Sequence, residues 1–344
     1  VREQYLDTVS KMFFSYFKAY LSRLFKLLMN DVATKDDVLG AEDQVKSSFF
    51  SSKATVRSRA AVFTLGNRRE LLTTGLLAPL LVPHVLQQHN HKLALADHAS
   101  HEYLFLTDFF LVSGESAIAL HASAMGRALA HLTQMWTAKA AENWDAISLY
   151  LCICLSARFR LLMTERQVPA LDDYWDGLLD VLWKQLDVVM RLHVSSLNAV
   201  DPKKLQSPVD TRPHYVGFPA GQPVDLPLMR VCPFQMVRRW AELVSGLLAV
   251  NESWSGEVGP KLEALLENAE DALERLLQRM AATQSGGGGG NATNNIAPLV
   301  LLVNNYDLVL TTLDERVARD TKLQHSLAEH EQTLRTALST GGAG

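Results

Sequence analysis

The chain has 344 residues, of which 48% are hydrophobic and 20% charged, so it is long enough for about two ordinary domains. Its formal net charge of -4 excludes a general nucleic-acid binder, because such a protein needs a dominating basic face to neutralise phosphates. Three cysteines, Cys152, Cys154 and Cys232, are too few for a disulfide scaffold and indicate a reducing compartment.

Residues 4–31 carry the first helical pattern. Lys11, Lys18, Arg23 and Lys26 interleave with it. Two structures fit: a basic amphipathic helix on an anionic membrane, or a helix packed on its neighbours with solvated lysines. Because the pattern is already running at the first residues and no initiator Met precedes it, we expect a fragment of a longer protein. The apolar and aromatic residues at three- and four-residue spacing are Tyr5, Val9, Met12, Phe13, Tyr16, Phe17, Tyr20, Leu24 and Leu27.

Residues 32–60 change character and predict a long loop, and a turn follows at Gly66-Asn67. One glycine cannot supply the ring of backbone N–H groups that a phosphate loop needs, so no cofactor site is expected here. Five histidines then follow, but the pair at His89 and His91 does not have the i, i+4 spacing of zinc ligands on one helix face. We expect a polar loop leading into a helix, and no metal site. The histidines are His84, His89, His91, His98 and His101.

Helical patterns cover residues 97–112, 116–137 and 138–165. Cys152 and Cys154 are two residues apart and face different sides of a helix, so we interpret them as small core residues. The longest apolar runs, 146–157 and 76–82, are too short for a membrane span of roughly 20 residues.

A helix is predicted over residues 170–199, with Pro169 in its first turn. The macrodipole at its start favours Asp172, Asp173 and Asp176, which removes the need for a catalytic role. Its apolar stripe is wide enough to be buried on more than one side.

The rest of the chain alternates loops and helices. Loops are predicted at about 206–233 and 284–295, and helices at 234–251, from Pro260, at 296–319 and up to about 338. The helix from Pro260 fits a coiled-coil seam or a bundle face. Because almost no stretch alternates with period two, the fold class is all-α with roughly eight to ten helices. We expect one helical bundle in residues 1–141 and a second in residues 142–344.

Nine stretches, in order and spacing, resemble the C-terminal part of the vacuolar protein sorting-associated protein 52 family over about residues 1–320. Residues 217–236 and the glycine run at 286–290 depart from the family pattern as insertions, and both lie in expected loops. The resemblance does not include the family's N-terminal coiled-coil region, which is associated with assembly of the complex, so we do not expect these residues to assemble through that region. The nine stretches are 16–21, 35–43, 63–68, 81–84, 102–105, 109–114, 168–175, 210–215 and 303–307.

This resemblance implies a non-enzymatic subunit of a vesicle-tethering complex for retrograde transport from endosomes to the trans-Golgi network. It implies an elongated array of helical bundles, a tethering-complex rod. Its partners would be the other subunits of the Golgi-associated retrograde protein complex and of the endosome-associated recycling protein complex, a Golgi Rab GTPase and SNAREs. The protein would be cytoplasmic and peripheral on trans-Golgi network and endosome membranes, with indirect membrane association.

The turn at residues 210–215 is the candidate for partner binding, through Arg212, His214 and Tyr215. The alternative, which we favour, is that the turn locks two helical layers together. Asp210 can cap the following backbone N–H groups, and Pro213 fixes φ. A remote alternative is an all-α enzyme that uses His214 with Asp210. One His beside one Asp is more often a local hydrogen-bonding cap, and catalysis needs several groups converging in a pocket.

Overall fold

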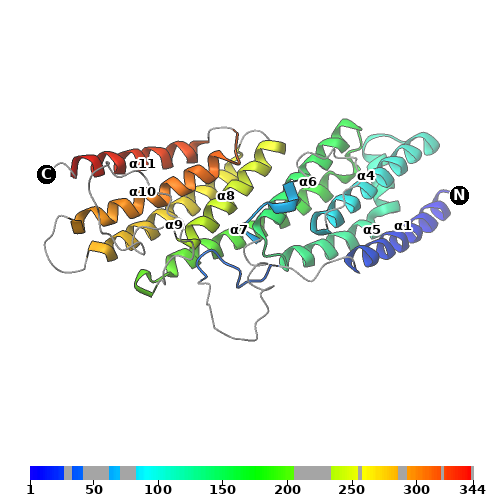
Figure 1. The fold of residues 1–344 in the computed structure, drawn as a ribbon. Helices are drawn as coiled ribbons and strands as arrows, with labels where there is room; N and C mark the ends of the chain where they lie inside the picture. The colour runs from blue at the N-terminus through cyan, green and yellow to red at the C-terminus, as the bar shows by residue number, and fades with distance from the viewer. Residues whose placement is uncertain are drawn as a thin grey trace, which may run out of the picture. The chain divides into compact units, whose positions relative to one another are not determined.

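The structure is a computed structural model that describes residues 1–26, 33–41, 62–69, 83–204, 234–254, 258–285, 293–318 and 321–341. The described residues form nine α-helices and three short 3-10 helices, without a β-strand among them (Figure 1). The all-α fold class is therefore confirmed. Their arrangement as a rod stays a prediction.

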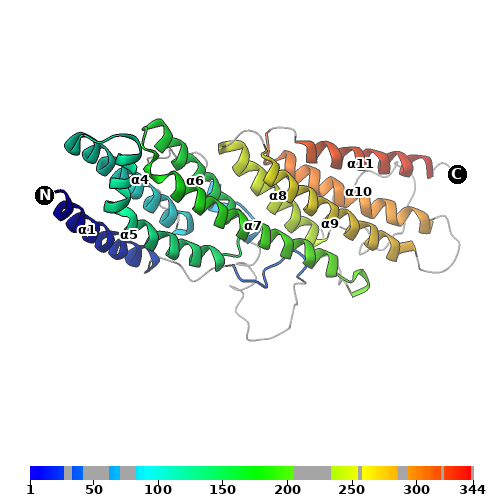
Figure 2. The same ribbon diagram turned by 180° about the vertical axis from the view of Figure 1, so that it is seen from behind.

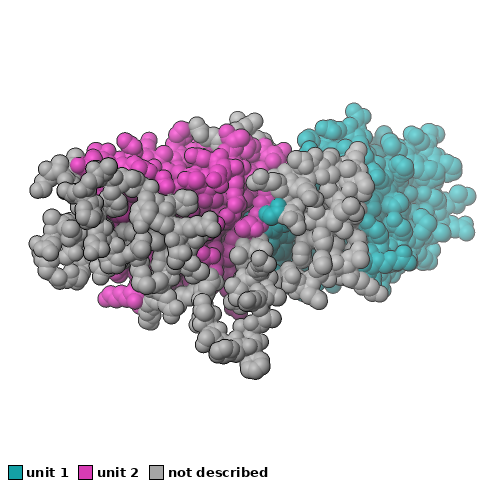
Figure 3. Space-filling view, viewed as in Figure 1, with its two compact units in different colours: residues 1–34, 66–188 teal, residues 35–65, 189–344 magenta. Residues whose placement is uncertain are grey.

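Contacts between Cα atoms divide the chain into two compact units (Figure 3). Unit 1 comprises residues 1–34 and 66–188, and unit 2 comprises residues 35–65 and 189–344. The boundary that we expected between residues 141 and 142 lies inside unit 1, between two of its helices. The expected division into bundles at residues 1–141 and 142–344 stays a prediction.

Unit 1 begins with α1, whose buried residues are spaced by four. Val9, Phe13, Phe17 and Leu21 form one face, and α1 packs with it chiefly on α5, while α4 packs on α5 and α6 (Figure 2). This packing favours the solvated-lysine alternative for the first helix. The elements of unit 1 are α1 (Arg2–Lys26), η1 (Gly66–Arg69), α4 (Pro83–Phe110), α5 (Gly114–Ala141), α6 (Ala146–Glu165), η2 (Pro169–Leu171) and the first part of α7 (Asp172–Ala199).

Helix α6 is the core of unit 1, because every residue from Ala146 to Ser156 is buried. Aromatic rings join it to α7: Phe159 stacks on Trp175 with centroids 6.1 Å apart, and Tyr150 meets Trp183 edge-on at 6.0 Å. Both contacts join α7 to the same helix, so the expectation that α7 is buried on more than one side stays a prediction.

The break between α6 and α7 has a defined cause. Gln167 has a φ of 58°, in the left-handed region, and the Val168 N–H bonds the Met163 carbonyl at 3.0 Å. This is the Schellman arrangement that satisfies the last carbonyls of a helix. Pro169 then opens η2, as the sequence predicted.

Two local expectations were wrong. Residues 138–165 are not one helix, because α5 ends at Ala141 and Asp145 caps a new helix by accepting a hydrogen bond from the Ser148 N–H. The histidine-rich segment is not a loop but the first half of α4, which begins at Pro83 and tolerates that proline in its first turn.

Unit 2 is built around α10, which packs on α8, α9 and α11 (Figure 1). The apolar seam of α9 is buried within this unit, so it is a bundle face. The elements are the end of α7, η3 (Pro202–Lys204), α8 (Gln235–Trp254), α9 (Pro260–Ser285), α10 (Thr293–Asp314) and α11 (Lys322–Gly341).

The C-terminal end of α7 is capped by one side chain of α9. The Arg279 guanidinium donates to the carbonyls of Leu197, Asn198 and Val200 at 2.8–2.9 Å. A cation at a helix C-terminus is favoured by the macrodipole and satisfies carbonyls that have no partner within the helix.

Candidate interaction surface

The three residues predicted to bind partners, Arg212, His214 and Tyr215, lie outside the described residues. Their role stays a prediction. The other stretches of the resemblance lie largely in described parts of the chain, and several have a structural role.

The stretch 35–43 is described to residue 41 and packs on α7 and α8. Leu39 is buried, and the Gly40 N–H donates to Ser196 Oγ at 3.0 Å. Arg239 of α8 donates to the Ala41 carbonyl at 2.6 Å. This segment therefore holds two helices of unit 2 in place.

The next stretch, residues 63–68, contributes to both units. In unit 2, Phe63 and Leu65 are buried, and the Phe63 ring meets His193 edge-on at 5.7 Å. The Arg239 guanidinium lies 5.8 Å from the centre of the Phe63 ring.

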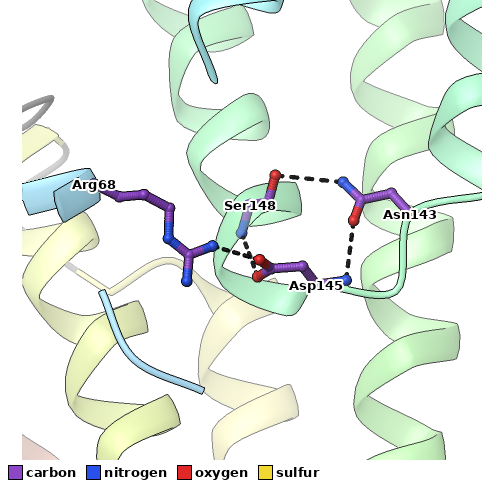
Figure 4. Close-up of polar contacts among 4 residues, drawn as sticks. All are labelled: Arg68, Asn143, Asp145 and Ser148. Carbon is purple, nitrogen blue, oxygen red and sulfur yellow. Dashed lines mark hydrogen bonds and ion pairs between the residues drawn. The ribbon is translucent and has the colours of Figure 1, made fainter. Parts of the chain in front are cut away.

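In unit 1, Arg68 belongs to a polar network at the start of α6 (Figure 4). Arg68 Nη1 lies 2.5 Å from Asp145 Oδ2, and both side chains are largely shielded, at 12% and 19% exposure. Asp145 Oδ1 accepts from the Ser148 N–H at 2.9 Å, and Asn143 Oδ1 accepts from the Asp145 N–H at 2.9 Å. Gln185 of α7 donates to the Asn143 carbonyl at 3.0 Å. The network fixes η1, the α5–α6 turn and α7 around one carboxylate.

The stretch 303–307 has the same kind of role in unit 2. Buried Asn305 donates to the Leu301 carbonyl at 2.7 Å and accepts from the Phe234 N–H at 3.2 Å, where α8 begins. Asp307 pairs with Arg335 of α11 at 3.2 Å. The sequence motifs mark these stretches but not their structural roles, because most of these contacts join residues far apart in the chain.

Several titratable groups are buried without forming a reaction centre. Burial lowers the pKa of His121 and of His193 to about 4, so both are neutral at pH 7. Burial lowers the pKa of Lys92 to about 8, and its Nζ donates to the Cys152 carbonyl at 3.0 Å and to Ser156 Oγ at 2.7 Å.

The thiols do not form a reactive pair. Burial raises the pKa of Cys152 to about 11 and of Cys154 to about 12, which keeps both protonated at pH 7. Both residues are buried, as expected of small core residues. Within the described ranges, no group of three or more His, Cys, Asp or Glu side chains could hold a metal ion.

Helix α6 is the one described helix that is long and apolar enough to cross a membrane. It is longer than the apolar run counted in the sequence, because the helix continues to Glu165. Of its most apolar window, 72% is buried inside the protein, which is the pattern of a core helix.

Among the described residues, the most prominent exposed apolar surface lies where α4 ends, and we call it the aromatic corner. It consists of Tyr5 of α1 and residues Leu104, Phe105, Phe109, Phe110 and Leu111. Phe105 and Phe109 stack at 5.2 Å, and Tyr5 meets Phe105 at 5.3 Å and Phe110 at 5.8 Å.

The outer residues of the aromatic corner remain open to solvent. Leu104 is 50% exposed, Phe109 60% and Leu111 90%. Phe105 and Phe109 are both exposed and stack on one another, and clustered exposed apolar side chains are typical of interaction sites. The aromatic corner is therefore the candidate interaction surface of the described residues.

Comparison with known families decides the family of this chain. A family model described as "Vps52, C-terminal" matches residues 7–338. The chain belongs to the Vps52 family. The resemblance found in the sequence is thereby confirmed.

Relatives within the Vps52 family come from animals and plants. The vacuolar protein sorting-associated protein 52 homolog of Caenorhabditis elegans is 42% identical, over 96% of this chain and 46% of the relative. The Homo sapiens homolog is 36% identical, over 94% of this chain and 42% of the relative. Protein 52 A of Arabidopsis thaliana is 28% identical, over 96% of this chain and 43% of the relative.

The chain spans less than half the length of these Vps52 relatives. No solved structure matches it. Roles for this chain are therefore argued from its own helices, buried networks and aromatic corner.

Proposed function

We propose that this chain is part of a non-enzymatic subunit of a multisubunit vesicle-tethering complex in retrograde transport from endosomes to the trans-Golgi network. The observation that carries this proposal is the match of the Vps52 C-terminal family model to residues 7–338. The relatives are named for vacuolar protein sorting, which supports a role in protein transport.

Buried and shielded polar residues form structural contacts between helices, which supports a scaffolding role. The Arg68–Asp145 pair, the Arg279 cap and Asn305 all hold helices or loops in register. A protein that presents surfaces to partners needs such rigid helical units more than it needs a pocket with converging acids and bases.

The partners proposed are the sister subunits of the Golgi-associated retrograde protein complex and of the endosome-associated recycling protein complex, together with a Golgi Rab GTPase and SNAREs. The protein would act in the cytoplasm, peripheral on trans-Golgi network and endosome membranes. Indirect membrane association is supported by α1, since Phe13, Phe17 and Leu21 are buried and cannot enter a bilayer from this fold.

The experiment compares the longer protein with a version lacking residues 7–338. Both are expressed in cells depleted of the endogenous protein, and recycling of a Golgi-returning cargo is measured. We expect the intact protein to restore recycling and the truncated one to fail. Restoration by the truncated protein would overturn the role proposed for this part of the chain.

A pulldown tests the Rab partner. The chain is incubated with Golgi Rab proteins loaded with GTP or with GDP, and we expect selective binding of the GTP form. Equal binding to both forms, or none, would remove the Rab from the proposed partners.

For the turn at residues 210–215, we favour a lock between helical layers over a partner site. Arg212→Ala and Tyr215→Ala should then lower the melting temperature, measured by circular dichroism, and His214→Ala is compared with them. Unchanged stability together with lost partner binding would reverse this preference.

A further inference from the structure

The aromatic corner combines two features that are unfavourable for the isolated chain. Phe109 and Leu111 keep 60% and 90% of their surface in water. In addition, Leu111 has a φ of 52°, in the left-handed region that favours glycine. An exposed leucine in a backbone conformation suited to glycine points to a role for its side chain outside the fold.

The charges around the aromatic corner are mostly negative. Residues 2–5 and 102–115, which carry the corner, contain four carboxylates and one guanidinium. The guanidinium of Arg2 lies 5.8 Å from the centre of the Phe110 ring. The carboxylates belong to Glu3, Glu102, Asp108 and Glu115.

One of these carboxylates lies under the corner. Glu102 is 7% exposed and accepts hydrogen bonds from the Tyr5 hydroxyl at 3.1 and 3.3 Å. Burial raises the pKa of Glu102. Among the described residues no Lys or Arg pairs with it, so a cation brought by a partner would favour its ionised form.

We infer that the aromatic corner docks an amphipathic helix of a sister subunit, with leucine or phenylalanine on one face and lysine or arginine beside them. The apolar face would cover Phe105, Phe109 and Leu111, and the basic residues would meet the exposed carboxylate of Asp108. This inference rests on the proposed function.

The charges disfavour two other occupants. An anionic bilayer attracts basic segments and repels a surface rich in carboxylates. A second copy related by a two-fold axis would bring the same acidic border against itself.

The experiment labels a cysteine placed in the corner. The longer protein carries Phe109→Cys or Leu111→Cys, and the rate of maleimide labelling is measured alone and after reconstitution with the sister subunits. Leu161→Cys is the control, because Leu161 is 59% exposed and belongs to α6, which contributes no residue to the corner. We expect at least tenfold protection of the corner cysteines on assembly, and no protection of the control.

Two substitutions separate binding from folding. Leu111→Gly removes the exposed side chain and suits the left-handed backbone, so the melting temperature should not fall while affinity for the sister subunits drops several-fold. Asp108→Lys should weaken association by a similar factor, and association should weaken as salt is raised. Leu161→Gly is the matched control for lost apolar surface.

Each outcome of the labelling experiment supports or overturns the inferred partner. Assembly without protection of the corner overturns this inference while leaving the proposed function intact, and failure to assemble any complex counts against both. Protection by phosphatidylcholine–phosphatidylserine vesicles instead of subunits would assign the corner to lipid. Protection that rises with the concentration of the isolated chain would assign it to a second copy.

Discussion

Gly40 shows how one small residue allows a loop to lie against a helix. A Cβ atom at this position would lie 2.6 Å from the carbonyl carbon of Ser196 and 3.1 Å from the Leu197 nitrogen. Both atoms belong to the backbone of α7, which cannot rotate away as a side chain can. The close approach also permits the hydrogen bond from the Gly40 N–H to Ser196 Oγ.

Gly40→Ala should therefore lower the free energy of unfolding by about 2 kcal/mol or more, because the loop must move away from α7. Urea denaturation followed by circular dichroism measures the change. Gly126→Ala is the control, since its added Cβ in the middle of α5 would meet no atom within 4 Å apart from its chain neighbours and the backbone of its own helix. That substitution should raise stability by about 0.5–1 kcal/mol. Equal effects of the two would show that the loop does not pack as described.

At the scale of elements, Arg279 connects α9 to the end of α7 through three carbonyls. Arg279→Ala should lower the free energy of unfolding by about 2 kcal/mol, since it leaves these carbonyls without their charged donor. Arg275→Ala is the matched control one turn earlier, because its ion pair with Asp271 is exposed and measures 3.9 Å. The control should change stability by less than about 0.5 kcal/mol. Similar losses from the two variants, in thermal and urea unfolding, would contradict the capping role.

Asp145 has two separable roles at the start of α6. Asp145→Asn keeps an oxygen for the Ser148 N–H but removes the charge that pairs with Arg68. Asp145→Ala removes both, so its loss of unfolding free energy should exceed that of Asp145→Asn by about 1 kcal/mol.

A double-mutant cycle isolates the ion pair. Combining Arg68→Met with Asp145→Asn should give a coupling energy of about 1 kcal/mol or more, because the pair is largely shielded from water. A coupling near zero would show that Asp145 acts only as a helix cap.

At the scale of the whole molecule, each unit contains one buried histidine with a lowered pKa among its described residues. His121 lies in unit 1 and His193 in unit 2, and burial lowers the pKa of both to about 4. The unfolded chain binds these protons near pH 6.5, so stability is fully present above pH 6.5 and is lost as pH falls toward 4.

Between pH 7 and pH 5 each histidine should lower the free energy of unfolding by about 2 kcal/mol. Urea unfolding at both pH values measures this loss. His121→Leu and His193→Leu should each make the pH dependence shallower than in the unmodified protein. Identical pH dependence in all three proteins would contradict the neutral buried state.

Local information in the sequence accounts for most of the helices. Apolar spacing predicted the helix that became α7, and Pro169 and Pro260 marked starts that the structure confirms. The same reasoning missed the turn at 142–145, because Asn143 and Asp145 act there through hydrogen bonds that periodicity does not register. It also missed the start of α4, because a histidine-rich segment can be polar and still helical.

The sequence by itself determined the fold class, most helix starts and the family resemblance, since these depend on spacing, proline positions and short ordered motifs. The tertiary structure decided which apolar residues are covered. Phe17 and Phe109 both lie in helical apolar patterns, yet the first is buried and the second is 60% exposed. Periodicity specifies a face but not whether a neighbour covers it, because covering depends on segments distant in the chain. For the same physical reason, only the structure paired Arg68 with Asp145 and Gly40 with Ser196, and only the structure located the aromatic corner.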